Sequence, residues 1–331
     1  MPAPRIVVTR RIPEPALDLL RGSDADLWIS EHDRPLETGE LHQAVSGADA
    51  VVSLLHDRVD DAFLDAAGPQ LRSVSNVAVG YDNIDVPAAT ARGVVVTNTP
   101  GVLTEATADI AMGLVLMATR RLGEGERLIR SGAPWSWHMF FMLGSGLQGK
   151  TIGIVGLGGI GQAVARRARS FGMRVAYTSR TPSDPEVEAE LEAERMTLDA
   201  LLAQADVVSL HLPLSEETRH LIGAEALGRM KSGAYLINTA RGPVVDEAAL
   251  ADALKRGEIA GAGLDVFENE PDVHPALLEL ENVVLVPHLG SATKETRTAM
   301  AELAARNALA VTADEPPLTP VTPEVSQGSR P

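Results

Sequence analysis

The stretch GSGLQGKTIGIVGLGGIG, Gly144 to Gly161, decides the fold, and it contains two phosphate-binding patterns in succession. The first pattern, GSGLQGKT, fits G-x-x-x-x-G-K-[ST], which in triphosphate-binding proteins follows a strand and opens a helix. Here Lys150 and Thr151 instead begin an apolar, strand-like run, TIGIV, so Lys150 lies at the wrong end of the strand. We therefore reject a triphosphate loop.

The second pattern, GLGGIG, fits G-x-G-x-x-G and has the strand–turn–helix context that this motif needs. The apolar run Thr151–Val155 precedes it, and Ile160–Phe171 follows with helical spacing. In a dinucleotide site, Gly156 permits the tight turn, Gly158 lets the pyrophosphate approach the backbone, and Gly161 lets helix and strand pack closely. The alternative is a tight turn without a ligand. We predict that the cofactor contacts Gly156, Gly158, Gly159, Ile160 and Gly161.

The end of the next predicted strand bears on which dinucleotide is bound. An NAD site usually carries an acid there, which binds the ribose 2′-hydroxyl. This chain has Ser179, Arg180 and Thr181 at that point, and no acid before Asp184. Arg180 can pair with a 2′-phosphate, aided by the two hydroxyls. The sequence thus favours NADPH, with NADH as a weaker alternative, unless Arg180 only caps a surface loop.

The order of predicted elements indicates the architecture. Short β-branched runs alternate with amphipathic helical stretches, which predicts an α/β fold of two Rossmann-like, doubly wound parallel-sheet domains. A turn cluster, Thr97–Gly101, and Gly290 suggest the boundaries. We expect a dinucleotide-binding domain, residues 99–289, inserted into a flavodoxin-like substrate (catalytic) domain of residues 1–98 plus 290–331. The last six residues are expected to be disordered.

Composition excludes several function classes. The chain has 331 residues and a net charge of −16, so nucleic acid and anionic membrane surfaces are not expected partners. The absence of cysteine excludes disulfides and thiol catalysis and fits a cytoplasmic protein. The most apolar helical run, Ile110–Ala118, is too short to span a bilayer. No histidine spacing suggests a metal site.

Chemistry-bearing residues follow three of the predicted strands. Ligands of open α/β sheets bind beyond the carboxyl ends of strands, where Arg241, Glu270 and His288 emerge. An arginine can hold a substrate carboxylate and polarise its carbonyl, and a histidine can protonate the resulting oxygen. Glu270 would orient His288 and favour its protonated form. Each residue alone has a structural alternative, but together they suit reduction of a 2-oxo acid, with Thr239, Ala240 and Gly290 beside the cofactor.

Four ordered segments, GLGGIG, NTARGPVVDE, GLDVFENEP and PHLGSAT, resemble the D-2-hydroxyacid dehydrogenase family. The resemblance is collinear and extends to VAVGYDNID (77–85) and NTPGVLTEATAD (98–109). It implies that Arg241, Glu270 and His288 are the catalytic trio, with Arg241 and His288 contacting both substrate and cofactor. It also implies that Asp265 contacts the nicotinamide amide and that Thr107 lies near the cofactor. The backbone N–H groups of Val79 and Gly80 would hold the substrate carboxylate.

Within that family the chain is most similar to glyoxylate/hydroxypyruvate reductases, through SRT (179–181), WSWH (135–138) and the tail PPLTPVTPEV (316–325). This resemblance implies NADPH-preferring reduction of glyoxylate to glycolate and of hydroxypyruvate to glycerate. It also implies a homodimer in which Trp137 reaches the neighbouring subunit's site. The alternatives are an NAD-dependent phosphoglycerate- or lactate-type dehydrogenase, and a dinucleotide-sensing, corepressor-like interaction protein.

Overall fold

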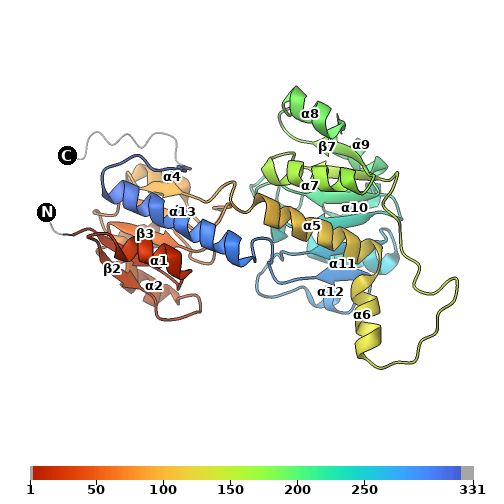
Figure 1. Cartoon of the computed structure of the whole chain (residues 1–331), viewed down its shortest axis with the longest axis horizontal. Helices are drawn as coiled ribbons and strands as arrows, with labels where there is room; N and C mark the ends of the chain where they lie inside the picture. The colour runs from red at the N-terminus through yellow and green to blue at the C-terminus, as the bar shows by residue number, and fades with distance from the viewer. Residues whose placement is uncertain (1–2, 322–331) are drawn as a thin grey trace. The chain divides into compact units, whose positions relative to one another are not determined.

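The computed structural model describes residues 3–321, which form two compact units (Figure 1). One comprises the described residues up to Leu103 together with those from Thr293, and the other comprises Thr104–Ala292. The unit changes where helices α5 (Thr104–Thr119) and α13 (Lys294–Thr312) begin, a few residues after the predicted boundaries at 98 and 289. The last six residues, expected to be disordered, lie outside the described range.

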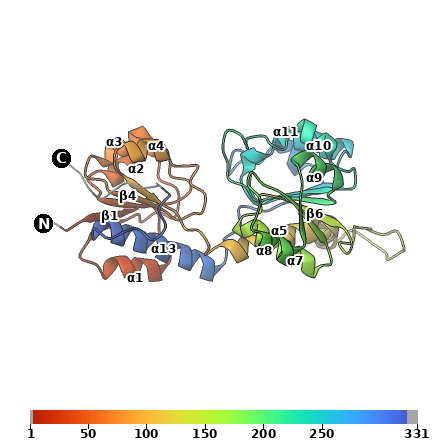
Figure 2. The same ribbon diagram turned by 90° about the horizontal axis from the view of Figure 1, so that it is seen from above.

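The first unit contains a five-stranded parallel sheet. Its strand order is β2 (Asp26–Ile29), β1 (Arg5–Val8), β3 (Ala50–Ser53), β4 (Ser73–Asn76), β5 (Val95–Thr97). One face is covered by α1 (Glu14–Arg21) and α13, and the other by α2 (Thr38–Val45), α3 (Asp61–Ala67) and α4 (Val86–Ala91) (Figure 2). This is the flavodoxin-like strand order, as predicted.

The second unit contains a seven-stranded parallel sheet. Its order is β12 (Val283–Leu285), β11 (Gly261–Leu264), β10 (Tyr235–Asn238), β9 (Val207–Leu210), β6 (Thr151–Val155), β7 (Arg174–Thr178), β8 (Ala193–Arg195). Helices α5, α7 (Gly159–Ser170) and α8 (Pro185–Leu191) cover one face; α9 (Leu198–Gln204), α10 (Ala224–Arg229) and α11 (Glu247–Arg256) cover the other (Figure 2). The order reverses between β6 and β9, which is the Rossmann switch point where ligands bind.

Small side chains let helices lie close to both sheets. In the first unit, Ala301, Ala304 and Ala308 of α13 are buried in one cluster with Ile6 and Val8 of β1. In the second unit, α5 and α7 contribute five buried alanines to the layer that also contains Ile152 and Ile154. Close layers of this kind are what a chain with few aromatics can build. The two predicted α/β domains with parallel sheets are therefore confirmed.

Lys150 lies just before β6, at the end of that strand opposite the Gly-rich turn. Its Nζ donates a hydrogen bond to Oγ of Ser145 at 2.5 Å. The residue is thus on the linker into the sheet, where it cannot serve a phosphate bound at the carboxyl edge. Among residues 3–321, no helix is long and apolar enough to cross a membrane.

Candidate active site

The Gly-rich turn joins β6 to α7 at the switch point of the second sheet. Gly156 has φ +96°, and a Cβ there would lie 2.6 Å from the carbonyl oxygen of His211. A Cβ on Gly161 would lie 2.2 Å from the carbonyl oxygen of Gly156, so the first turn of α7 sits directly on the strand end. Nothing lies within 4 Å of the corresponding position at Gly158. The turn thus leaves open space at the helix N-terminus, where the N–H groups of Gly159, Ile160 and Gly161 favour an anion.

The turn after β7 carries the residues predicted to select the cofactor. Asp184, the first acid beyond the strand, caps α8 by accepting from the Glu186 N–H at 2.8 Å, so its carboxylate is already engaged. Ser179 Oγ donates to the Thr181 carbonyl oxygen at 2.5 Å, which commits its proton within the loop. Arg180 is exposed and forms no ion pair with any residue of 3–321.

His288 and Glu270 come together as a pair. Nδ1 of His288 lies 2.8 Å from Oε2 of Glu270, and the two side chains are 30% and 22% exposed. The other carboxylate oxygen of Glu270 accepts from the Phe267 N–H at 3.1 Å, which fixes the carboxylate plane. Burial alone would raise the pKa of Glu270, but the hydrogen bond and charge of His288 outweigh it, and the pKa is lowered. Glu270 is therefore ionised. It pairs with Nδ1 of His288, so Nε2 is the ring nitrogen that can exchange a proton with a ligand.

Asp265 fixes the backbone on which His288 sits. Its carboxylate oxygens accept from the N–H groups of Leu289 at 2.5 Å and Gly290 at 2.8 Å. The N–H of His288 in turn donates to the Asp265 carbonyl at 2.9 Å, and His288 has φ +51°. Thr107 Oγ1 donates to the Gly290 carbonyl at 3.2 Å. Burial raises the pKa of Asp265, although these backbone N–H groups act against it.

Asn238 shapes the turn that presents Arg241. Its side chain is buried at the end of β10, where Oδ1 accepts from the Ala240 N–H at 3.0 Å and Nδ2 donates to the Arg241 carbonyl at 2.8 Å. Nη1 of Arg241 donates to the Ala240 carbonyl at 2.9 Å. Oγ1 of Thr239 is buried without a hydrogen-bond partner in the described residues. An unsatisfied hydroxyl beside the Gly-rich edge fits a polar cofactor.

Val79 and Gly80 belong to the first unit, in the loop after β4. Two asparagine side chains bind the backbone carbonyls of this loop. Asn98 Nδ2 donates to the Val79 carbonyl oxygen at 2.7 Å, and Asn76 Nδ2 donates to the Gly80 carbonyl oxygen at 3.0 Å. Within residues 3–321, the N–H groups of Val79 and Gly80 donate no hydrogen bond, so they can bind an anion. Sequence reasoning missed the two asparagines; the available signal was an amide side chain at the ends of two adjacent strands.

Trp137 lies on an arm between α6 (Leu122–Arg130) and β6, which projects from the body of the second unit in Figures 1 and 2. The structure does not bring it to the other predicted site residues of this unit. Its side chain is 75% exposed, and the neighbouring Phe140 is 81% exposed. Trp135 instead stacks on Phe141, with ring centroids 5.9 Å apart.

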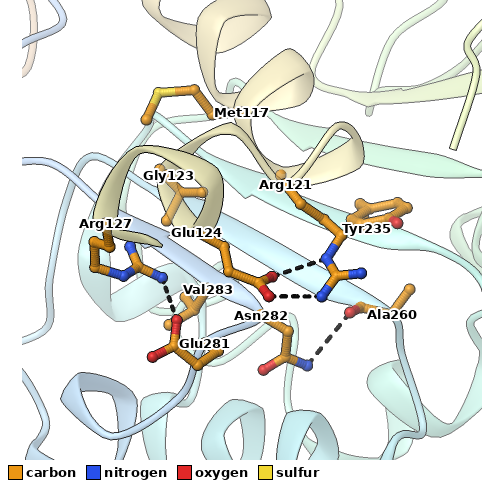
Figure 3. A pocket seen from close by; sticks show the side chains of 12 residues that line it. Met117, Arg121, Gly123, Glu124, Arg127, Tyr235, Ala260, Glu281, Asn282 and Val283 are labelled. Atoms are coloured by element: carbon orange, nitrogen blue, oxygen red, sulfur yellow. Dashed lines mark hydrogen bonds and ion pairs between the residues drawn. The ribbon is translucent and has the colours of Figure 1, made fainter. Parts of the chain in front are cut away.

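A cavity of about 300 Å³ lies elsewhere in the second unit, between α5, α6 and the amino ends of β10 and β12 (Figure 3). Its charged side chains pair with one another: Arg121 with Glu124 at 2.6 Å, and Arg127 with Glu281 at 2.5 Å. It contains none of the predicted site residues. No group of His, Cys, Asp or Glu able to hold a metal ion occurs within residues 3–321.

The chain is similar to known proteins over most of its length. The sequence model for "D-isomer specific 2-hydroxyacid dehydrogenase, NAD binding domain" matches residues 112–290. A glyoxylate reductase from Thermococcus onnurineus is 51% identical over 334 residues, covering 99% of this chain and 98% of the relative. Another, from Korarchaeum cryptofilum, is 52% identical over 327 residues, covering 97% of each.

A crystal structure of an NADPH-dependent glyoxylate/hydroxypyruvate reductase from Sinorhizobium meliloti, in complex with NADP and malonate, matches with a TM-score of 0.81. It is 38% identical and covers 96% of each chain. Full-length similarity, the Gly-rich turn and the paired histidine and glutamate lead to one conclusion. The chain belongs to the D-isomer specific 2-hydroxyacid dehydrogenase family and is an NAD(P)-dependent oxidoreductase.

Proposed function

We propose that the protein reduces glyoxylate to glycolate, and hydroxypyruvate to glycerate, with a preference for NADPH. The observation that carries this proposal is the 2.8 Å contact between His288 and the Glu270 carboxylate at the carboxyl edge of the second sheet. Arg241 follows a neighbouring strand at that edge. A proton donor with a charged partner, beside a fixed guanidinium, suits reduction of a carbonyl next to a carboxylate. The relatives named glyoxylate reductase support this substrate class.

The chain's own groups divide the work around the nicotinamide cofactor, which when bound supplies the hydride. Arg241 binds the substrate carboxylate and polarises the carbonyl. The N–H groups of Val79 and Gly80, in the first unit, are proposed hydrogen-bond donors to a carboxylate. Because Nδ1 of His288 faces Glu270, Nε2 donates the proton to the carbonyl oxygen. The ionised Glu270 stabilises the imidazolium before that transfer. In the reverse reaction, the neutral imidazole accepts the hydroxyl proton at Nε2.

Support for the NADPH preference comes from the turn after β7. Residues 179–183 contain no acid that would repel a 2′-phosphate, and Arg180 is exposed without an ion pair in the described part of the chain. Thr181 adds an exposed hydroxyl donor. A guanidinium binds phosphate bidentately, whereas a ribose 2′-hydroxyl gains much less from it. The Sinorhizobium relative is described as NADPH-dependent.

We also propose a homodimer, in which Trp137 of one subunit completes the substrate site of its partner. The support is the exposed apolar surface of the arm, including Trp137, Met139 and Phe140. Several large apolar side chains exposed on one segment are typical of a protein–protein interface. The cysteine-free composition supports a cytoplasmic location.

A panel of substrates and cofactors tests the proposal. We expect the purified protein to turn over glyoxylate and hydroxypyruvate with kcat/KM at least about tenfold above that for pyruvate, and NADPH to exceed NADH by a similar factor. The measurement is initial rates by cofactor absorbance with each pair. A higher kcat/KM with NADH would refute the cofactor preference. Dinucleotide binding without turnover of any 2-oxo acid would instead favour a sensing role.

Replacing Glu270 by glutamine should lower kcat/KM for glyoxylate reduction by about tenfold or more. Glutamine keeps a hydrogen bond to Nδ1 of His288 but removes the negative charge beside the ring. The measurement is the initial rate with NADPH at one fixed pH. The matched control is Glu268→Gln, because Glu268 pairs with a different histidine, His220. A kcat/KM for Glu270→Gln equal to that of the wild type would contradict the assigned role.

A further inference from the structure

We propose that Arg195 is a second specificity-determining cation of the 2′-phosphate site, an inference that rests on the proposed NADPH preference. Arg195 ends β8, and β8 pairs in parallel with β7 so that Arg195 lies opposite Tyr177. This register brings Arg195 to the carboxyl edge, next to the turn that carries Arg180. Its Nη2 donates to the carbonyl oxygens of Ser179 at 3.1 Å and Arg180 at 3.3 Å.

These two hydrogen bonds hold the first part of the turn. Farther along the turn, the Ser183 N–H donates to the Tyr177 hydroxyl at 3.0 Å, and that hydroxyl also contacts Glu188. The turn is therefore fixed by side chains of β7 and β8 before any ligand arrives. A preformed turn loses less conformational entropy when it binds a phosphate.

The charge of Arg195 is not compensated by an acid. Within residues 3–321 no carboxylate pairs with it, and its Nε and Nη1 groups make no hydrogen bond. The arginines of the adjacent helix α7 differ in this respect, because Arg166 pairs with Glu190 and Arg169 with Glu192. An exposed guanidinium that keeps free N–H donors beside Arg180 attracts a dianionic phosphate. A 2′-hydroxyl carries no charge, so this attraction discriminates between the two cofactors.

The competing explanation is that Arg195 only clamps the turn. Loss of a clamp would disturb the adenosine end of both cofactors to the same extent. Loss of a phosphate-binding cation would weaken only the ligand that carries the 2′-phosphate. A pair of ligands that differ in that one group therefore separates the two roles.

The test is calorimetric titration of the full chain with adenosine 2′,5′-bisphosphate and with adenosine 5′-monophosphate. For Arg195→Ala, we expect the bisphosphate to lose about tenfold more affinity than the monophosphate. Arg195→Lys keeps the charge but not the fork, and should lose about threefold. The control is Arg174→Ala, which removes an exposed arginine at the opposite end of β7 and should leave the affinity ratio at the wild-type value.

Each outcome has a distinct meaning. Equal losses for both ligands in Arg195→Ala, or a ratio equal to that of Arg174→Ala, would overturn the role of Arg195. A wild-type protein that binds both ligands equally would refute the NADPH preference itself, and the inference with it. Circular dichroism shows whether each variant is folded. If Arg195→Ala is not, Arg195→Lys decides, and a wild-type ratio in that variant counts against the proposal.

Discussion

Replacing His288 by alanine should lower kcat for glyoxylate reduction by about 10²–10⁴-fold, because the reaction loses its general acid. Glyoxylate accepts a hydride at carbon only as its oxygen gains a proton, and in the proposed mechanism Nε2 of His288 supplies it. NADPH binding should be largely retained, since the Gly-rich turn and the turn after β7 do not include this side chain. The measurements are steady-state rates and titration of NADPH fluorescence.

Two further variants make this result interpretable. His288 has φ +51°, so alanine there adds backbone strain; His288→Asn tolerates the left-handed region better and should show the same loss of turnover. His220→Ala is the matched control, because His220 also pairs with a glutamate, Glu268, but lies outside the proposed site. If His288→Asn keeps more than about a tenth of wild-type turnover, another group is the acid.

Replacing Gly242 by alanine should destabilise the second unit by about 3 kcal/mol or more. A Cβ at this position would lie 1.9 Å from the carbonyl carbon and oxygen of Phe267 and 2.4 Å from the nitrogen of Glu268. These are backbone atoms, so no side-chain rotation relieves the overlap. The turn after β10 and the loop that carries Glu270 must move apart, which also displaces Arg241 from its partners. We therefore expect turnover to fall together with stability.

Calorimetric unfolding measures the first effect, with an expected fall in Tm of roughly 6–12 °C. The control is Gly228→Ala in α10, where no atom lies within 4 Å of the added Cβ and alanine suits a helix better than glycine. That variant should be as stable as wild type or slightly more so. Similar Tm values for the two variants would contradict a close contact between position 242 and the Phe267 backbone.

Elements with a clear apolar period could be predicted from sequence, and those without one could not. The run TIGIV gave β6 with its observed bounds, because buried β-branched residues end at a glycine. Strands β4, SVSN, and β8, AER, were missed because most of their residues are polar. Strand β2, DLWI, was also missed, although most of its residues are apolar. β4 is fully buried and its backbone pairs with β3 on one side and β5 on the other, while β8 is a short edge strand. Both depend on tertiary pairing, which periodicity does not report.

The same limit applies to the candidate site. Residues that follow strands directly, such as Arg241 and His288, could be found because the carboxyl ends of parallel strands share one edge. Arg195 could not, since its position depends on a strand that the sequence did not predict and on the pairing of that strand with β7. The clamp from Asn98 to Val79 likewise depends on β4 and β5 being neighbours.

The hydrogen bond from Thr107 to Gly290 has a consequence for how such a chain could arise. These residues lie a few positions inside the points where the chain enters and leaves the second unit, Thr104 and Ala292. The ends of the inserted unit are therefore neighbours, as the two ends of a short loop would be. A gene fragment that encodes such a unit can enter a host gene between β5 and α13 and leave the host's five-stranded fold connected as before. In evolutionary terms, the second unit has the form of a transferable module.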